Sequence, residues 1–195
     1  MIAVLLAEGF EEIEALGTVD FLRRCGLDVK TYSIDGKQPV RSFPSELDTF
    51  LEGKQVTGAH GISVLADERA VRLPLDNTEC LVLPGGMPGT VNLARAQELI
   101  EHAYQNNLLI AAICAAPSIL AHLQLLDGKK ATCYPGYEEE LRDAGAIVIT
   151  DQPVVEDGNL ITSRGAGTVF DFAEAIAARF VGKDKAAEVR SQMIA

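Results

Sequence analysis

The chain has 195 residues, of which 48% are hydrophobic and 23% charged, values typical of one ordinary domain with a buried core. Lysine and arginine number 17 against 28 acidic residues, which gives a net charge of −11. Nucleic acids and anionic membrane surfaces would be repelled by such a charge, so neither is expected as a partner. The longest apolar run is broken at Pro117 and falls far short of the ~20 residues that span a bilayer.

The N-terminal residues lack the basic segment and cleavage site of an export signal, so we expect a cytoplasmic protein. Four cysteines are widely spaced and follow no CxxC pattern: Cys25, Cys80, Cys114 and Cys133. Without an export signal, neither a disulfide framework nor a structural zinc site is expected. Each cysteine is therefore expected to be a free thiol that either fills the core or carries chemistry.

Short apolar runs alternate with helical patterns along the chain, which predicts an α/β fold with a mostly parallel sheet covered on both faces. The predicted strands, in chain order, are 2–6, 27–33, 80–83, 108–113, 131–133, 147–150 and 160–162. The pattern also predicts helices at 12–24, 168–181 and 185–193, with Gly182 as a break between the last two. Residues 156–159 read as the turn of a hairpin between 153–155 and 160–162.

One polar segment, 37–55, is too long for a simple connection and contains two prolines and a glycine. Loops of that length are usually functional or mobile. The sequence shows no repeat and no linker that would divide the chain. We therefore expect a single domain over 1–195, with a possible insertion at 37–55.

Residues 108–123, with the sequence LLIAAICAAPSILAHL, pass directly from an apolar strand into a helix, and Cys114 lies at the junction. Alanines precede and follow Cys114, and a tight strand-to-helix turn needs such small neighbours. We expect the helix N-terminus to favour the thiolate by up to ~2 kcal/mol and the Ala115 amide to point toward a developing oxyanion. The alternative is that Cys114 is a small core residue, the commonest fate of a cysteine.

A second motif, LPGGMPGT at 83–90, follows strand 80–83 and precedes a helix. Gly85 and Gly86 should therefore lie at the carboxyl edge of the sheet, where open α/β sheets bind ligands. A phosphate-binding loop is the alternative, but the sequence has neither GxGxxG nor the Lys-Ser/Thr of a Walker motif. The first loop, expected at the same edge, carries four glutamates that would repel phosphate: Glu8, Glu11, Glu12 and Glu14.

These glutamates have different expected roles. Glu11 and Glu12 are interpreted as acids in a first helical turn that complement the helix dipole. Glu14 shares its helix with apolar residues at 13, 15 and 16 and lies close to the sheet edge. A carboxyl group buried there tends to have a raised pKa, so Glu14 can remain protonated and donate to a thiolate.

Five stretches together resemble the ThiJ/PfpI family, the group that includes the parkinsonism-associated protein deglycase and its bacterial relatives. They run in family order across nearly the whole chain: AEGFEEIEALGTVDFLRR, LVLPGGMPGTVNL, LIAAICAAPSIL, KKATCYPGYEEEL and LITSRGAGTVFDFAEAI. The resemblance implies a flavodoxin-like three-layer sandwich with the cysteine on its elbow, usually assembled as a homodimer. The exposed side of the first helix offers Leu16, Val19 and Leu22 as candidates for that interface.

The resemblance also implies roles for individual residues. Cys114 takes the position of the nucleophile, and Glu14 that of the protonated glutamate that hydrogen-bonds it. Three residues fall where the family places oxyanion-type amides: Gly85, Gly86 and Ala115. His60 falls at a position whose side chain typically approaches the active site, often from the partner subunit.

The chain departs from the family at Tyr134, where many relatives have a histidine that is often proposed as a catalytic base. Tyrosine is a poor general base at neutral pH because its unperturbed pKa is ~10. His122 lies eight residues past Cys114, which is about 12 Å along a helix, and His102 belongs to an earlier segment. A Cys–His hydrolase is therefore disfavoured, and Glu14 must carry any proton transfer.

Two functions remain open at this point. The first is a cofactor-independent cysteine enzyme that acts on reactive aldehydes such as methylglyoxal, which it converts to lactate, or on their adducts, and so protects against stress. The second is a redox sensor or stress-response binding protein in which Cys114 is oxidised reversibly. Thiamine-pathway chemistry is a third, less favoured reading, because the sequence shows no recognisable thiazole or phosphate site. The sequence indicates no metal site.

Overall fold

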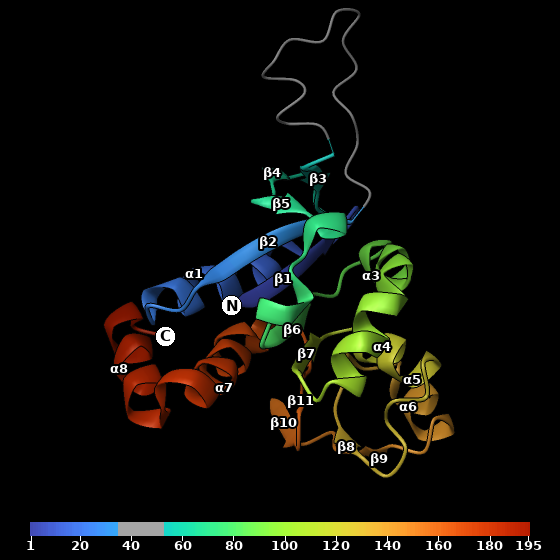
Figure 1. The fold of residues 1–195 in the computed structure, drawn as a ribbon. Helices are drawn as coiled ribbons and strands as arrows, with labels where there is room; N and C mark the ends of the chain where they lie inside the picture. The colour runs from blue at the N-terminus through green and yellow to red at the C-terminus, as the bar shows by residue number, and fades with distance from the viewer. Residues whose placement is uncertain (35–52) are drawn as a thin grey trace, which may run out of the picture.

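A computed structural model describes residues 1–34 and 53–195 of the chain. Most of the possible insertion at 37–55 lies outside the described residues. The main sheet has seven strands in the order β10-β11-β7-β6-β1-β2-β5 (Figure 1). Their bounds are β1 Ile2–Ala7, β2 Val29–Ile34, β5 Glu68–Arg69, β6 Cys80–Leu83, β7 Leu109–Ile113, β10 Val154–Asp157 and β11 Leu160–Ser163.

Every neighbouring pair in this sheet is parallel except β10 and β11. The three central strands β1, β6 and β7 are buried along their whole length. Strands covered on both faces need apolar side chains on both, which is why these strands read as uninterrupted apolar runs. The predicted mostly parallel α/β fold is confirmed.

Helices cover the two faces of the sheet in separate groups (Figure 1). Val4 and Leu6 of β1 pack with one group, which holds Phe172 of α7, whereas Leu5 packs with the other, which holds Leu120 of α5. The helices are α1 Thr18–Arg24, α3 Gly89–Leu93, α4 Gln97–Gln105, α5 Pro117–His122, α6 Glu138–Asp143, α7 Val169–Val181 and α8 Lys183–Met193. Short 3₁₀ turns occupy Ala70–Arg72, Leu75–Asn77, Ala94–Ala96 and Ala166–Thr168.

Several local predictions differ from the structure. The strands expected at 131–133 and 147–150 do not join the main sheet but pair with each other, as β8 Lys130–Ala131 and β9 Ile147–Val148. The hairpin turn is shorter than expected, because Asp157 pairs directly with Leu160. A further antiparallel pair, β3 Gln55–Thr57 and β4 Ser63–Leu65, was not predicted, since three-residue strands show too little alternation to be recognised.

The first helix also differs from its prediction. It begins with a π-helical turn, Ile13–Gly17, and only then continues as α1. Val19 and Leu22 are buried in the core formed with α7 and α8, so these two candidates for a dimer interface are wrong. Gly182 separates α7 from α8 as expected, with a positive φ of 83° that suits glycine.

The described residues contain no helix that is both long enough and apolar enough to span a membrane.

Candidate functional site

The site is centred on Cys114, which follows directly after β7. Its backbone lies in the left-handed region, with φ of 64°, a conformation that costs a non-glycine residue on the order of 1–3 kcal/mol. Its amide donates to the carbonyl of Ser163, 3.0 Å away, which anchors the turn to β11. Ala115 and Ala116 are buried behind it, and α5 begins at Pro117. The predicted strand-to-helix elbow is confirmed.

Cys114 also differs from the other cysteines in exposure. All four thiols are free, but Cys25, Cys80 and Cys133 are buried, whereas Cys114 is partly accessible. Burial, together with the nearby Glu14 carboxylate, raises the pKa of the Cys114 thiol to about 12. Hydrogen bonds from the backbone amides of Ala115 and Gly86 act in the opposite direction. Among the four cysteines, Cys114 is therefore the one that is both accessible to solvent and hydrogen-bonded by two backbone amides.

Glu14 lies in the π-helical turn and is 1% exposed. The amide of Gly85 donates to its Oε2 at 2.8 Å, while its Oε1 is buried without a hydrogen-bond partner. Burial raises the pKa of Glu14 to about 7, although hydrogen bonds with Gly85 and Cys114 lower it. The structure thus has the raised carboxyl pKa that the sequence predicted. At neutral pH a large fraction of Glu14 carries a proton.

The two side chains control each other's charge. Apart from burial, the main causes of the high Cys114 pKa are the charge and the hydrogen bond of an ionised Glu14. A proton on Glu14 removes the repulsion and supplies a donor to the thiolate, which is a charge-assisted hydrogen bond. The expected acidification by the helix N-terminus is wrong, since α5 starts three residues after Cys114 and burial outweighs it.

The paired glycines have separate roles. A Cβ at position 85 would lie 2.7 Å from Cys114 Cβ and 2.8 Å from Glu14 Oε2, so only glycine fits between them. Because its amide donates to Glu14, Gly85 positions the carboxyl group and is not free to bind an oxyanion as the sequence suggested. Gly86, with φ of 97°, directs its amide to the thiol. Of the three amides expected to bind an oxyanion, those of Gly86 and Ala115 hydrogen-bond the thiol.

Tyr134 borders the thiol without replacing the absent histidine. Its amide donates to the Cys114 carbonyl at 2.8 Å, and its side chain is half exposed. A Cβ at Gly165 would lie 3.3 Å from the Tyr134 ring and 4.0 Å from Cys114 Sγ. His122 pairs with Glu140 at 3.2 Å and does not serve the thiol. Among the described residues, Glu14 is therefore the acid–base group that hydrogen-bonds Cys114.

His60 pairs with Glu12 of its own chain. The His60 ring Nδ1 lies 2.8 Å from Glu12 Oε2, and the His60 amide donates to Oε1 at 2.8 Å. Although burial opposes ionisation, hydrogen bonds from His60 and Ile62 hold the pKa of Glu12 below its usual value, and Glu12 in turn raises the pKa of His60. Glu12 is buried and anchors the turn after β3, so its interpretation as a helix-dipole acid is wrong.

Glu11 has the role expected at a helix start, because its Oε2 accepts a hydrogen bond from the Glu14 amide at 2.7 Å. Ligand atoms of Glu11, Glu12 and His60 also lie within 4.8 Å of one another, close enough to hold a cation. The Glu12–His60 ion pair accounts for this grouping without one.

The loop after β11 is a part of the site that sequence reasoning missed. Ser163 and Thr168 share a hydrogen bond between their hydroxyl oxygens at 2.7 Å, which closes the loop that carries Gly165. The backbone of Ala166 hydrogen-bonds to Glu14 and lowers its pKa. The SRGAGT sequence within the last matching stretch was the available signal, but its spacing alone assigns no role to these residues.

A family model described as "DJ-1/PfpI family" matches residues 1–179. Protein dj-1beta of Drosophila melanogaster is 34% identical over 194 residues, which cover 98% of this chain and 95% of that protein. A deglycase of Pyrococcus abyssi is 30% identical over 171 residues, which cover 87% of this chain and 92% of that protein.

Solved structures agree with this match. The crystal structure of Drosophila DJ-1beta superposes with a TM-score of 0.86 at 34% identity, covering 99% of this chain and 96% of that one. The structure titled Toxoplasma gondii DJ-1, oxidized, superposes with a TM-score of 0.83 at 26% identity, covering 99% and 97%.

The protonated Glu14 makes the stability of the protein depend on pH. Between the ordinary pKa of 4.5 and the folded value of about 7, the folded protein holds a proton that the unfolded chain has lost. The free energy of unfolding therefore falls as pH rises through this range. A Glu14→Gln variant lacks this loss of stability. At pH 8 its free energy of unfolding should therefore have risen, relative to that of wild type, by on the order of 3 kcal/mol.

Denaturant unfolding of both proteins from pH 4.5 to 8 measures this difference. Glu98→Gln, an exposed substitution on α4, is the matched control and should follow wild type at every pH. Parallel stability curves for wild type and Glu14→Gln would mean that Glu14 is ionised in the folded protein.

Proposed function

Because the chain belongs to the DJ-1/PfpI family, we propose that it is a cofactor-independent cysteine enzyme acting on reactive aldehydes or their adducts. The observation that carries the proposal is the pairing of a partly accessible thiol with a buried carboxyl group whose pKa lies near neutrality. A deglycase among the relatives supports this substrate class. The free thiols fit a reducing compartment such as the cytoplasm.

For methylglyoxal, the reaction begins when the Cys114 thiol gives its proton to the Glu14 carboxylate and the resulting thiolate adds to the aldehyde carbon. The electron pair of the C=O bond moves to the oxygen, which the amides of Gly86 and Ala115 stabilise and Glu14 protonates. The product of this step is a hemithioacetal. Both amides already hydrogen-bond the thiol, which supports their role in holding the new oxyanion.

Glu14, now a carboxylate, removes the proton from the hemithioacetal carbon and returns it to the neighbouring carbon through an enediol, while the hydroxyl proton on the former aldehyde oxygen passes to the neighbouring oxygen. This transfer leaves a lactoyl thioester on Cys114, and water hydrolyses it to lactate and the free thiol. A group that both gives and takes a proton works best with a pKa near the operating pH, and the pKa of Glu14 is about 7. Deglycation begins at the same site from a hemithioacetal or aminocarbinol.

The substitution Glu14→Gln tests this mechanism, because it keeps a donor to Cys114 but removes the proton shuttle. Methylglyoxal turnover should fall at least ~100-fold, the usual effect of removing an acid–base group, while iodoacetamide labelling of Cys114 persists. Glu14→Asp shortens the side chain and should weaken both turnover and labelling. Steady-state lactate production gives the rates, with Cys114→Ser as the inactive reference. A Glu14→Gln rate near wild type would refute the proton-transfer role.

A redox-sensing function is the alternative, and the accessible Cys114 favours it over the buried thiols. A relative solved in an oxidised form supports this reading. In this case the wild type turns over no aldehyde, and limiting peroxide oxidises Cys114 before the other cysteines, as seen by peptide mass spectrometry. Rapid turnover, or preferential oxidation of another cysteine, would exclude it.

A homodimer is proposed as the assembly, with His60 reaching toward the Cys114 pocket of the partner. Two exposed apolar side chains flank the Glu12–His60 pair: Ile13 and Ile62, which are 56% and 54% exposed. Light scattering at micromolar concentration should give a dimer, and Ile62→Glu should give a monomer. Ile147→Glu, equally apolar and 51% exposed on β9, is the control that should remain dimeric. A monomeric wild type would contradict the assembly and the role of His60.

A further inference from the structure

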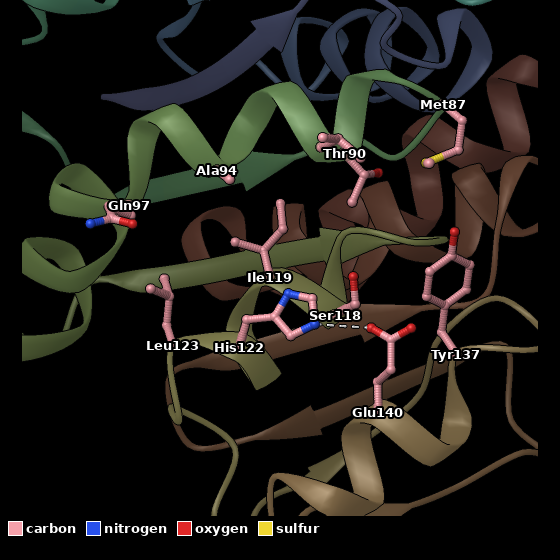
Figure 2. Close-up of a pocket in the computed structure, with 11 residues that line it drawn as sticks. Met87, Thr90, Ala94, Gln97, Ser118, Ile119, His122, Leu123, Tyr137 and Glu140 are labelled. Carbon is pink, nitrogen blue, oxygen red and sulfur yellow. Dashed lines mark ion pairs between the residues drawn. The ribbon is translucent and has the colours of Figure 1, made fainter.

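A cavity of about 440 Å³ opens beside the Cys114 site, between α3 on one side and α5 and α6 on the other (Figure 2). Neither Cys114 nor Glu14 lines it. Its volume falls within the range of small-molecule sites, about 300–1,000 Å³. A molecule as small as methylglyoxal needs no such space, so the proposed reaction does not account for this cavity.

Three residues that line the cavity belong to chain segments that also contact the thiol or its backbone. Met87 directly follows Gly86, whose amide reaches the sulfur. Ser118 of α5 donates its hydroxyl to the carbonyl of Ala115 at 2.8 Å. Tyr137 donates its amide to the carbonyl of Tyr134 at 3.2 Å. The cavity therefore shares three of its lining segments with the thiol site.

The lining is mostly apolar, with Met87, Ile119 and Leu123 among its side chains. Met87 is 54% exposed, and its flexible side chain can adapt to ligands of different shape. None of the residues that line the cavity is lysine or arginine, and its one histidine, His122, lies 3.2 Å from the carboxyl group of Glu140. Such a surface favours an uncharged apolar group over a phosphate or a carboxylate.

One polar group in the wall lacks a partner. Thr90 is 5% exposed, and its hydroxyl makes no hydrogen bond with any described residue. Its side chain points from α3 toward the cavity in Figure 2. The Thr90 amide donates to the Gly86 carbonyl at 2.8 Å, which ties its position to the glycine loop. A buried hydroxyl without a partner is unfavourable. The Thr90 oxygen is covered in this structure, so a rotation of the side chain would bring it to a ligand carbonyl in the cavity.

We propose that this cavity is a second subsite, which binds an uncharged apolar group attached to the reacting carbonyl. In this subsite the Thr90 hydroxyl donates a hydrogen bond to the carbonyl oxygen of a ligand amide. The proposal rests on the proposed function for the identity of the reacting carbon. It adds no chemical step and concerns binding alone. The subsite selects substrates larger than methylglyoxal and discriminates against anionic ones.

Ala94→Trp tests the subsite, because Ala94 is an exposed residue on the cavity wall and the indole would fill the space. Its kcat/KM for phenylglyoxal should fall at least ~10-fold, the scale of discrimination by a hydrophobic pocket. The value for methylglyoxal, which does not reach the cavity, should remain within about twofold of wild type. Ala187→Trp on α8, also an exposed alanine, is the matched control and should leave both values unchanged. An equal loss for both substrates, or no loss for either, would overturn the proposal.

Binding of an unreactive probe separates the subsite from the reaction. N-acetyl-phenylalaninamide should bind wild type at least ~10-fold more tightly than N-acetyl-phenylalanine, whose carboxylate finds no cation, and Ala94→Trp should abolish the difference. If the wild type turns over neither glyoxal, the proposed function fails, but these titrations still test the cavity. Equal affinity for the two probes in wild type would refute the subsite.

Thr90→Val tests the hydrogen bond to the ligand, because it removes the hydroxyl and keeps the shape of the side chain. It should weaken binding of the amide probe while leaving the melting temperature unchanged or raised, since the hydroxyl has no partner in the folded chain. A lowered melting temperature with unchanged probe binding would assign Thr90 a purely structural role and overturn its part in the subsite.

Discussion

A carboxyl group and a thiol lie together at the carboxyl edge of the sheet, and the charge of each depends on the proton of the other. Burial makes two negative charges there unfavourable, so the pKa values of Glu14 and Cys114 both rise. Near neutral pH Glu14 gains and loses its proton, so an acid–base group lies beside the thiol without a histidine. The remaining architecture of the site can be understood as the support that this pair requires.

That support comes from four separate segments of the chain. The left-handed backbone of Cys114 brings the sulfur to the amides of Ala115 and Gly86. The π-helical turn places Glu14 inside the protein, where the amide of Gly85 holds one carboxyl oxygen. The loop after β11 closes the site at Gly165. Because parallel strands end at one edge, loops distant in sequence converge here.

The central strands and the elbow were predictable because they depend on local features, namely apolar runs and small residues around Cys114. The roles of Gly85 and Glu12 were not, because each depends on a contact with a segment far away in sequence. The Gly85 amide meets a carboxylate 71 residues away, and Glu12 meets His60, 48 residues away. The π-helical turn was also hidden, since its extra residue leaves the apolar pattern of 12–24 intact. The position of the site could therefore be predicted from local sequence patterns, whereas its hydrogen bonds depend on tertiary contacts that these patterns do not show.

The central claim is that Glu14 holds a proton at neutral pH beside Cys114. Infrared difference spectroscopy of wild type against Glu14→Gln isolates the carbonyl band of this one carboxylic acid. We predict that the band persists well above pH 4.5 and disappears with a midpoint at about pH 7. In a Cys114→Ala background the midpoint should shift, because the thiol contributes to the pKa. A band that disappears at pH 4.5 would show an ordinary ionised glutamate and contradict the account.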